Sequence, residues 1–235
     1  MGTTERYKKN AIDKLSTLVG SYDSAHITGD KSQVEILNFN YTDLKNVSLR
    51  CLDGFNVQNG EKLVSENHDL TYYKKINVEN IHGEIDKQNI IFGIDSHDDQ
   101  KLQNHDFQLL VQPFTKTSRK LRMTESTDFS IRSSYHNIVF FGHSLSDADY
   151  SYFEYIFDEV NLYSSNCNLI FKYATAYDSD NAHAIKASVC ENVEKLIRRY
   201  QDTLPENQQK DLFNRLLIQH RIQIIDIDET KNYEK

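Results

Sequence analysis

The chain has 235 residues, of which 38% are hydrophobic and 26% are charged, and this is the composition of a globular protein long enough to bury a core. Its formal net charge of −8 disfavours nucleic acid as a partner, because phosphate binding requires a basic surface. No apolar run approaches the roughly 18 residues that span a bilayer, and residues 1–10 lack the apolar core of a signal peptide. We therefore expect a cytoplasmic protein with no membrane partner.

The first half of the chain is expected to contain a helix followed by short strands. Apolar residues recur at helical spacing within residues 1–20, which predicts an amphipathic helix. Apolar runs of strand length follow in residues 34–39, 76–81 and 89–95, and turn residues separate them. Residues 107–123 have a helical pattern that Pro113 is expected to interrupt.

The second half alternates apolar strands with helices. Strands are predicted for "NIVFF" at 137–141, for "NLIFKYA" at 168–174 and for "RIQIIDID" at 221–228. One helix is expected to begin after Ser146, with Asp149 completing a capping box, another to cover residues 182–201, and a third to follow Pro205. Continuously apolar strands separated by helices predict an α/β fold, with a mostly parallel sheet flanked by helices.

Three turns follow the predicted strands, and in parallel sheets ligands bind beyond the carboxyl ends of strands. The turns are Phe39-Asn-Tyr-Thr-Asp43, His82-Gly83 and Gly142-His-Ser-Leu-Ser-Asp147. We expect them to lie around one crevice. Asn40 and His82 have structural alternatives, because an asparagine after a strand usually stabilises its own turn and a histidine in a turn is often simply exposed.

Ser144 lies in Gly-His-Ser-Leu-Ser, which nearly matches the G-x-S-x-G elbow of serine hydrolases. Asp178 with His183 or His220 could complete a triad. Against this interpretation, Asp147 and Asp149 would place negative charge where an oxyanion must be stabilised. The alternative is a turn that contacts a nucleotide through its backbone amides, which requires only a glycine and a polar turn before the helix. Its aspartates could then accept hydrogen bonds from sugar hydroxyls or merely cap the helix.

Other clusters favour simpler interpretations. The basic run at residues 116–122 is more typical of a solvated helix end than of a phosphate contact. No known tight metal-site spacing occurs, so we predict a solvated acidic loop and no metal site for the histidines and aspartates at 97–99, 105 and 106. The 3 cysteines are odd in number and widely spaced, which indicates reduced thiols, and the 14 tyrosines leave room for a partner surface.

Three motifs stand in order along the chain: "LNFNYTD", "NIHGEIDKQNIIFGID" and "IVFFGHSLSDADYSYFEYIF". Together they resemble the AbiH family of bacteriophage abortive infection proteins, and the resemblance covers residues 34–160 most closely. It implies a role in phage defence. The same order of an asparagine, a His-Gly pair and a glycine turn is also similar to the sirtuin-type NAD-binding fold, which implies a Rossmann-like three-layer domain.

The resemblance also implies roles for individual residues. Asn40 would contact the ribose of NAD or orient a water, and His82 would be the general base or a ribose contact. The implied NAD-binding residues are Gly83, Gly142, His143, Ser144 and Asp147. NAD is then a ligand or a substrate, and the implied activity is that of an NAD glycohydrolase.

The resemblance has one departure. AbiH proteins usually open with a strand and a glycine-rich loop of the type G-N-G-F-D-L, and no such motif precedes Asn40. We therefore expect residues 1–235 to form a single α/β domain that is incomplete at its N-terminus. The expected partners are a nucleotide and either a second copy or a companion defence protein. The alternatives are a non-catalytic sensor of a defence system and a serine hydrolase using Ser144.

Overall fold

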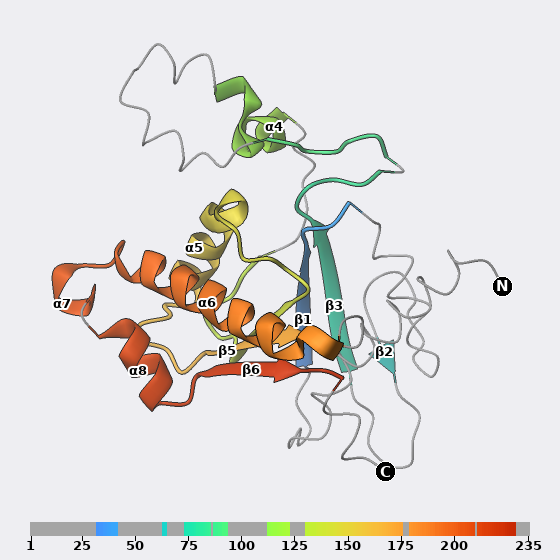
Figure 1. Ribbon diagram of the computed structural model, residues 1–235. Helices are drawn as coiled ribbons and strands as arrows, with labels where there is room; N and C mark the ends of the chain where they lie inside the picture. Colours follow the sequence, from blue (N-terminus) through green and yellow to red (C-terminus); the bar gives the residue numbers. More distant parts are fainter. Residues whose placement is uncertain are drawn as a thin grey trace. The chain divides into compact units, whose positions relative to one another are not determined.

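The computed structural model describes residues 32–41, 63–64, 73–85, 87–93, 112–122, 130–175, 179–209 and 211–228 (Figure 1). The chain divides into two units, of which the first comprises residues 1–92 and 119–129 and the second residues 93–118 and 130–235. The helix expected within residues 1–20 and the acidic loop expected around residues 97–106 lie outside the described residues.

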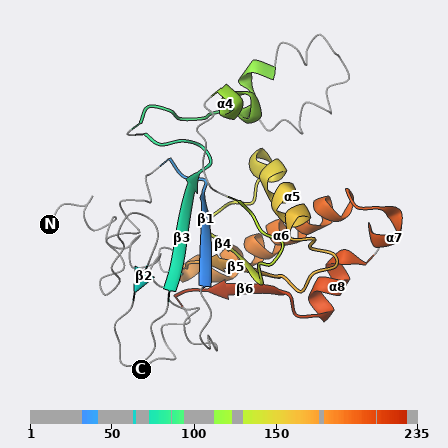
Figure 2. The same cartoon turned by 180° about the vertical axis from the view of Figure 1, so that it is seen from behind.

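The first unit contains a sheet with the strand order β1-β3-β2. Strands β1 (Ser32–Asn38) and β3 (Tyr73–Asn80) are parallel and lie side by side in Figures 1 and 2, whereas β2 (Leu63–Val64) pairs antiparallel with β3. The register pairs Asn38 with Asn80, the last residue of each strand. The two turns that follow these strands therefore start at the same edge of the sheet, as the sequence predicts.

The segment after β3 is not the strand that the sequence predicts. Residues 89–93 form no strand, although their apolar side chains suggested one. Instead they fold back on the preceding turn, where the Ile91 amide donates a hydrogen bond to the His82 carbonyl at 2.8 Å and the Ile91 side chain is buried. The apolar run is used to cover a turn, and Phe92 remains 55% exposed.

The second unit contains a wholly parallel sheet with the order β4-β5-β6. Its strands are β4 (Asn137–Phe141), β5 (Asn168–Tyr173) and β6 (Ile222–Asp226), and all three were predicted. The strands are connected by the helices α5 (Tyr150–Glu159), α6 (Ala182–Gln201), α7 (Glu206–Gln209) and α8 (Leu212–Ile218). Parallel sheets flanked by helices confirm the α/β class, but the described strands form two sheets and not one.

Aromatic side chains build the core of the second unit. Phe140 of β4 stacks on Phe171 of β5 with 4.6 Å between ring centroids, and the edges of Phe153 and Phe157 from α5 approach the same ring. Tyr200 of α6 meets Phe157 at 5.1 Å. Because Phe153, Phe157 and Tyr200 are almost fully buried, the aromatic residues after the Gly142 turn anchor α5 to the sheet.

The start of α5 differs from the prediction. A short 3-10 helix, η3 (Asp147–Asp149), precedes α5, and neither Ser146 nor Asp149 makes a side-chain capping hydrogen bond. The expected capping box is wrong because the Asp149 carboxylate pairs with Lys116 and His143 instead. Pro113 lies in a 3-10 turn, η2 (Gln112–Phe114), which precedes the helix α4 (Lys116–Arg122), whereas the part of the predicted helix before residue 112 lies outside the described residues.

Within the described ranges, no helix combines the length and the apolar character that a membrane crossing requires.

The two cysteines in the described ranges are free, and we expect them to differ in their reactivity toward alkylating reagents. Cys167 is buried, and burial raises the pKa of its thiol to about 11, although the nearby Arg221 acts in the opposite direction. Cys190 is exposed on α6. We expect iodoacetamide at pH 7.5 to label Cys190 in the native protein and to leave Cys167 unlabelled, because the thiolate is the reactive form. Peptide mass mapping checks this, and labelling of Cys167 at the rate of Cys190 would contradict the burial described above.

Candidate functional site at the strand ends

A chain of buried amides joins the ends of β1 and β3 in the first unit. Asn38 Nδ2 donates to Asn80 Oδ1 at 2.7 Å, and Asn80 Nδ2 donates to Glu84 Oε1 at 2.6 Å. Asn38 Oδ1 accepts from the backbone amide of Asn40 at 3.0 Å. All of these side chains except that of Asn40 are buried. Each amide is therefore fixed in orientation, because its oxygen and its nitrogen both have assigned partners.

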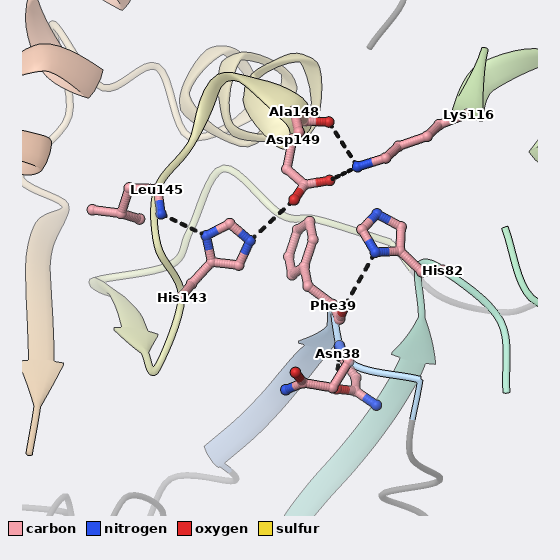
Figure 3. Close-up of polar contacts among 9 residues, drawn as sticks. Asn38, Phe39, His82, Lys116, His143, Leu145, Ala148 and Asp149 are labelled. Carbon is pink, nitrogen blue, oxygen red and sulfur yellow. Dashed lines mark hydrogen bonds and ion pairs between the residues drawn. The ribbon is translucent and has the colours of Figure 1, made fainter. Parts of the chain in front are cut away.

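His82 follows β3 in the same unit, and its ring has a defined hydrogen-bonding role. Its Nδ1 lies 3.1 Å from the carbonyl oxygen of Phe39, the residue after β1 (Figure 3). A carbonyl can only accept, so Nδ1 carries the hydrogen and Nε2 is the basic nitrogen of the neutral ring. The ring is buried, with 4% exposure, and the edge of Phe39 packs against it at 5.6 Å between centroids.

Gly83 is required by the conformation of the turn that holds His82. Its φ of +75° lies in the left-handed region that favours glycine, and a Cβ there would lie 2.1 Å from the carbonyl oxygen of Asn89. The Asn89 side chain accepts from the Glu84 amide at 2.7 Å, which closes the turn. Gly83 therefore shapes the turn through its backbone. Asn40, which follows β1 by two residues, has an exposed side chain.

The Gly142 turn in the second unit is also held by a histidine, in the opposite tautomer. The Leu145 amide donates to His143 Nδ1 at 2.9 Å, so Nδ1 is the acceptor and Nε2 carries the hydrogen. His143 Nε2 lies 3.2 Å from Asp149 Oδ2 (Figure 3). Gly142 and Leu145 have φ of +61° and +56°, so the left-handed backbone falls on them and not on Ser144, the residue that an elbow would strain.

A buried ion pair stands behind this turn. Lys116 Nζ donates to Asp149 Oδ1 at 2.6 Å and to the Ala148 carbonyl at 2.8 Å, and both charged side chains are at most 10% exposed. The preference for a solvated basic run is therefore wrong for Lys116, the first residue of α4. Asp149 is neither a cap nor an exposed acceptor for sugar hydroxyls, because Lys116 and His143 occupy its two oxygens.

The remaining predicted residues of this turn lie at the surface. Ser144 is exposed, and its carbonyl accepts from Asn192 of α6 at 3.3 Å. Asp147 is also exposed and pairs with Arg199, whose guanidinium lies 3.7 Å from the centroid of the Tyr150 ring. A Cβ on Gly142 would meet no other described residue within 4 Å, so the turn has open space above its glycine.

The structure thus gathers the predicted residues into two sets. Asn40, His82 and Gly83 lie together in the first unit, and Gly142, His143, Ser144 and Asp147 lie together in the second. That all three turns share one crevice stays a prediction. Sequence reasoning missed four buried polar residues: Asn38, Asn80, Glu84 and Lys116. An asparagine that ends each of two apolar strands was the available signal for the first two.

The chemistry available here is that of amides, carboxylates and imidazoles. In the described part of the chain, no three side chains of histidine, cysteine, aspartate or glutamate are grouped so that they could hold a metal ion. Polar turns follow the carboxyl ends of parallel strands in each unit, and this is the position at which α/β folds in general bind ligands.

The family follows from a comparison with known proteins. The family model of "Bacteriophage abortive infection AbiH" matches residues 3–173, so the chain belongs to the AbiH family of phage-defence proteins. No curated protein and no solved structure matches it. The matched range includes both sets of strand-end residues.

The buried pair gives a stability prediction. We expect Lys116→Met to destabilise the second unit by about 3–5 kcal/mol, because it leaves the Asp149 charge buried without its cation. The matched control is Lys195→Met, since Lys195 and its partner Glu191 are both well exposed on α6. Urea denaturation followed by far-ultraviolet circular dichroism measures both variants. Equal midpoints for Lys116→Met and Lys195→Met would show that the pair does not hold the turn.

Proposed function

We propose that this AbiH protein acts in phage defence by binding NAD, or a related nucleotide, at its strand-end turns and hydrolysing the bond between nicotinamide and ribose. The observation that carries the proposal is the hydrogen bond between His82 Nδ1 and the Phe39 carbonyl oxygen, from which we infer that Nε2 is the acceptor nitrogen of the ring. His82 lies at the carboxyl ends of two parallel strands, where such folds bind their ligands.

The hydrolysis needs a base and an oriented water. Water attacks C1′ of the nicotinamide ribose, the C1′–N bond breaks, and its electron pair leaves with nicotinamide, which becomes neutral. Nε2 of His82 accepts the proton of the attacking water, so the products are ADP-ribose, nicotinamide and a proton. The exposed amide of Asn40 can hold the ribose or the water, since it offers both a donor and an acceptor.

The Gly142 turn supports nucleotide binding in its own way. Its glycine leaves space for close backbone approach, its Ser144 side chain is exposed, and the Asp147 carboxylate can accept from a ribose hydroxyl. A sirtuin-like fold belongs to this proposal, as does a second copy or a companion defence protein as partner. Loss of NAD in an infected cell fits a family whose description is abortive infection.

The proposal predicts NAD cleavage that depends on His82. We expect the purified full chain to release nicotinamide from NAD and His82→Ala to lower the rate by about 10²–10⁴-fold, the usual contribution of a general base. His136→Ala is the control, because His136 is exposed just before β4. Chromatography of the products measures the rate, and plaque counts measure protection of cells carrying each variant.

Two outcomes separate this proposal from its rivals. If the full chain neither binds nor cleaves NAD, and His82→Ala protects cells as well as the unchanged chain does, the enzymatic account fails and a sensor remains. If a fluorophosphonate probe labels the unchanged chain and Ser144→Ala removes the label, the serine-hydrolase alternative gains the support that it lacks now.

A further inference from the structure

An exposed apolar and aromatic patch lies beside His82 in the first unit. It consists of Tyr41, Ile85 and Phe92, and Ile85 and Phe92 are both 55% exposed. We propose that this patch is the subsite for the positively charged nicotinamide ring of NAD. This inference rests on the proposed function and deepens it, because it names the part of the substrate that the patch recognises.

Ring contacts place the patch against the proposed base. The centroids of Tyr41 and Phe92 are 4.9 Å apart with a tilt of 48°, and the centroids of Tyr41 and His82 are 6.0 Å apart with a tilt of 35°. Tyr41 therefore contacts both the exposed ring and the buried imidazole. Tyr41 thereby links the exposed Phe92 ring to His82, so a ligand ring that stacks on Tyr41 lies against a side chain that itself packs on the imidazole.

Backbone hydrogen bonds hold the patch in place. The Ile85 amide donates to the Tyr41 carbonyl at 3.0 Å, and the Ile91 amide donates to the His82 carbonyl at 2.8 Å. Phe92 follows Ile91 directly, so its position is tied to the turn that carries His82. The three side chains come from the segments after β1 and β3, which Asn38 and Asn80 fix to each other. The patch is thus built before a ligand arrives, which lowers the entropic cost of binding.

The charge of the ring decides which ligand the patch favours. Faces of tyrosine and phenylalanine attract a cation through the ring quadrupole, and planar rings also stack on them. The nicotinamide ring is cationic in NAD, whereas it is neutral in NADH and as the released product. An aromatic subsite next to the base therefore favours the oxidised substrate and lets the neutral product leave.

The described residues of the patch are sufficient for one heteroaromatic ring, for which stacking and cation–π contacts contribute most of the recognition.

Equilibrium binding to the full chain tests the subsite without turnover. The probes are carba-NAD, in which a methylene replaces the ring oxygen of the nicotinamide ribose and prevents cleavage, NADH, and ADP-ribose, which lacks the nicotinamide ring. Calorimetry measures the three affinities for the unchanged chain, for Phe92→Ala, for Phe92→Tyr, which keeps a ring, and for Leu217→Ala, a control at an exposed leucine of α8.

The expected result is specific for one ligand and one variant. Phe92→Ala weakens carba-NAD binding by about tenfold, Phe92→Tyr and Leu217→Ala leave it unchanged, and ADP-ribose binds all four proteins equally. The unchanged chain binds carba-NAD more tightly than NADH. Far-ultraviolet circular dichroism confirms that each variant is folded.

The outcomes that overturn the inference differ from those that overturn the proposed function. If the unchanged chain binds the nucleotides and Phe92→Ala binds carba-NAD equally well, or loses carba-NAD and ADP-ribose to the same extent, only the subsite is wrong. If Phe92→Ala keeps all three affinities but loses phage protection, the patch contacts a macromolecule and the subsite is again wrong. If the unchanged chain binds none of the three, both proposals fall.

Discussion

The hydrogen bond between Asn38 and Asn80 is the contact on which the first unit depends. It joins the final residues of two parallel strands that are in register, and both side chains are buried. Breaking it would leave buried amide groups without their partners, which costs more than the bond itself contributes. Because the turns with His82 and Tyr41 start from these two residues, the bond fixes the distance between the proposed base and the aromatic patch.

The two histidines of the strand-end turns show how one residue type takes different roles. His82 gives its Nδ1 hydrogen to a backbone carbonyl, so Nε2 is the acceptor nitrogen of its ring. His143 uses Nδ1 to accept from Leu145 and Nε2 to meet Asp149, so it holds its turn in shape. The hydrogen bonding of His82 is the kind that a general base requires, whereas the hydrogen bonding of His143 holds the backbone of its turn in position. Membership of the AbiH family sets both within phage defence.

Periodicity predicted the strands β1, β3, β4, β5 and β6 and the long helix α6 correctly, because strand-length apolar runs and a helical apolar spacing can be read from the sequence. It failed at residues 89–93, because an apolar run can cover a turn as well as pair with a strand. It also failed at Lys116 and Asp149, whose pairing joins residues far apart in sequence. Side-chain partners of this kind depend on tertiary packing, which local patterns do not contain. The position of His82 was predictable, but its tautomer required the Phe39 carbonyl.

The proposed hydrolysis depends most on Nε2 being the acceptor nitrogen of the His82 ring. Two-bond ¹⁵N–¹H correlation spectra of the full chain, with His82→Ala and His143→Ala used for assignment, measure the tautomer of each ring directly at a pH where both are neutral. We predict that His82 carries its hydrogen on Nδ1 and that His143 carries its hydrogen on Nε2. A His82 ring with its hydrogen on Nε2 would contradict the central claim, because the nitrogen assigned as the base would then be a donor.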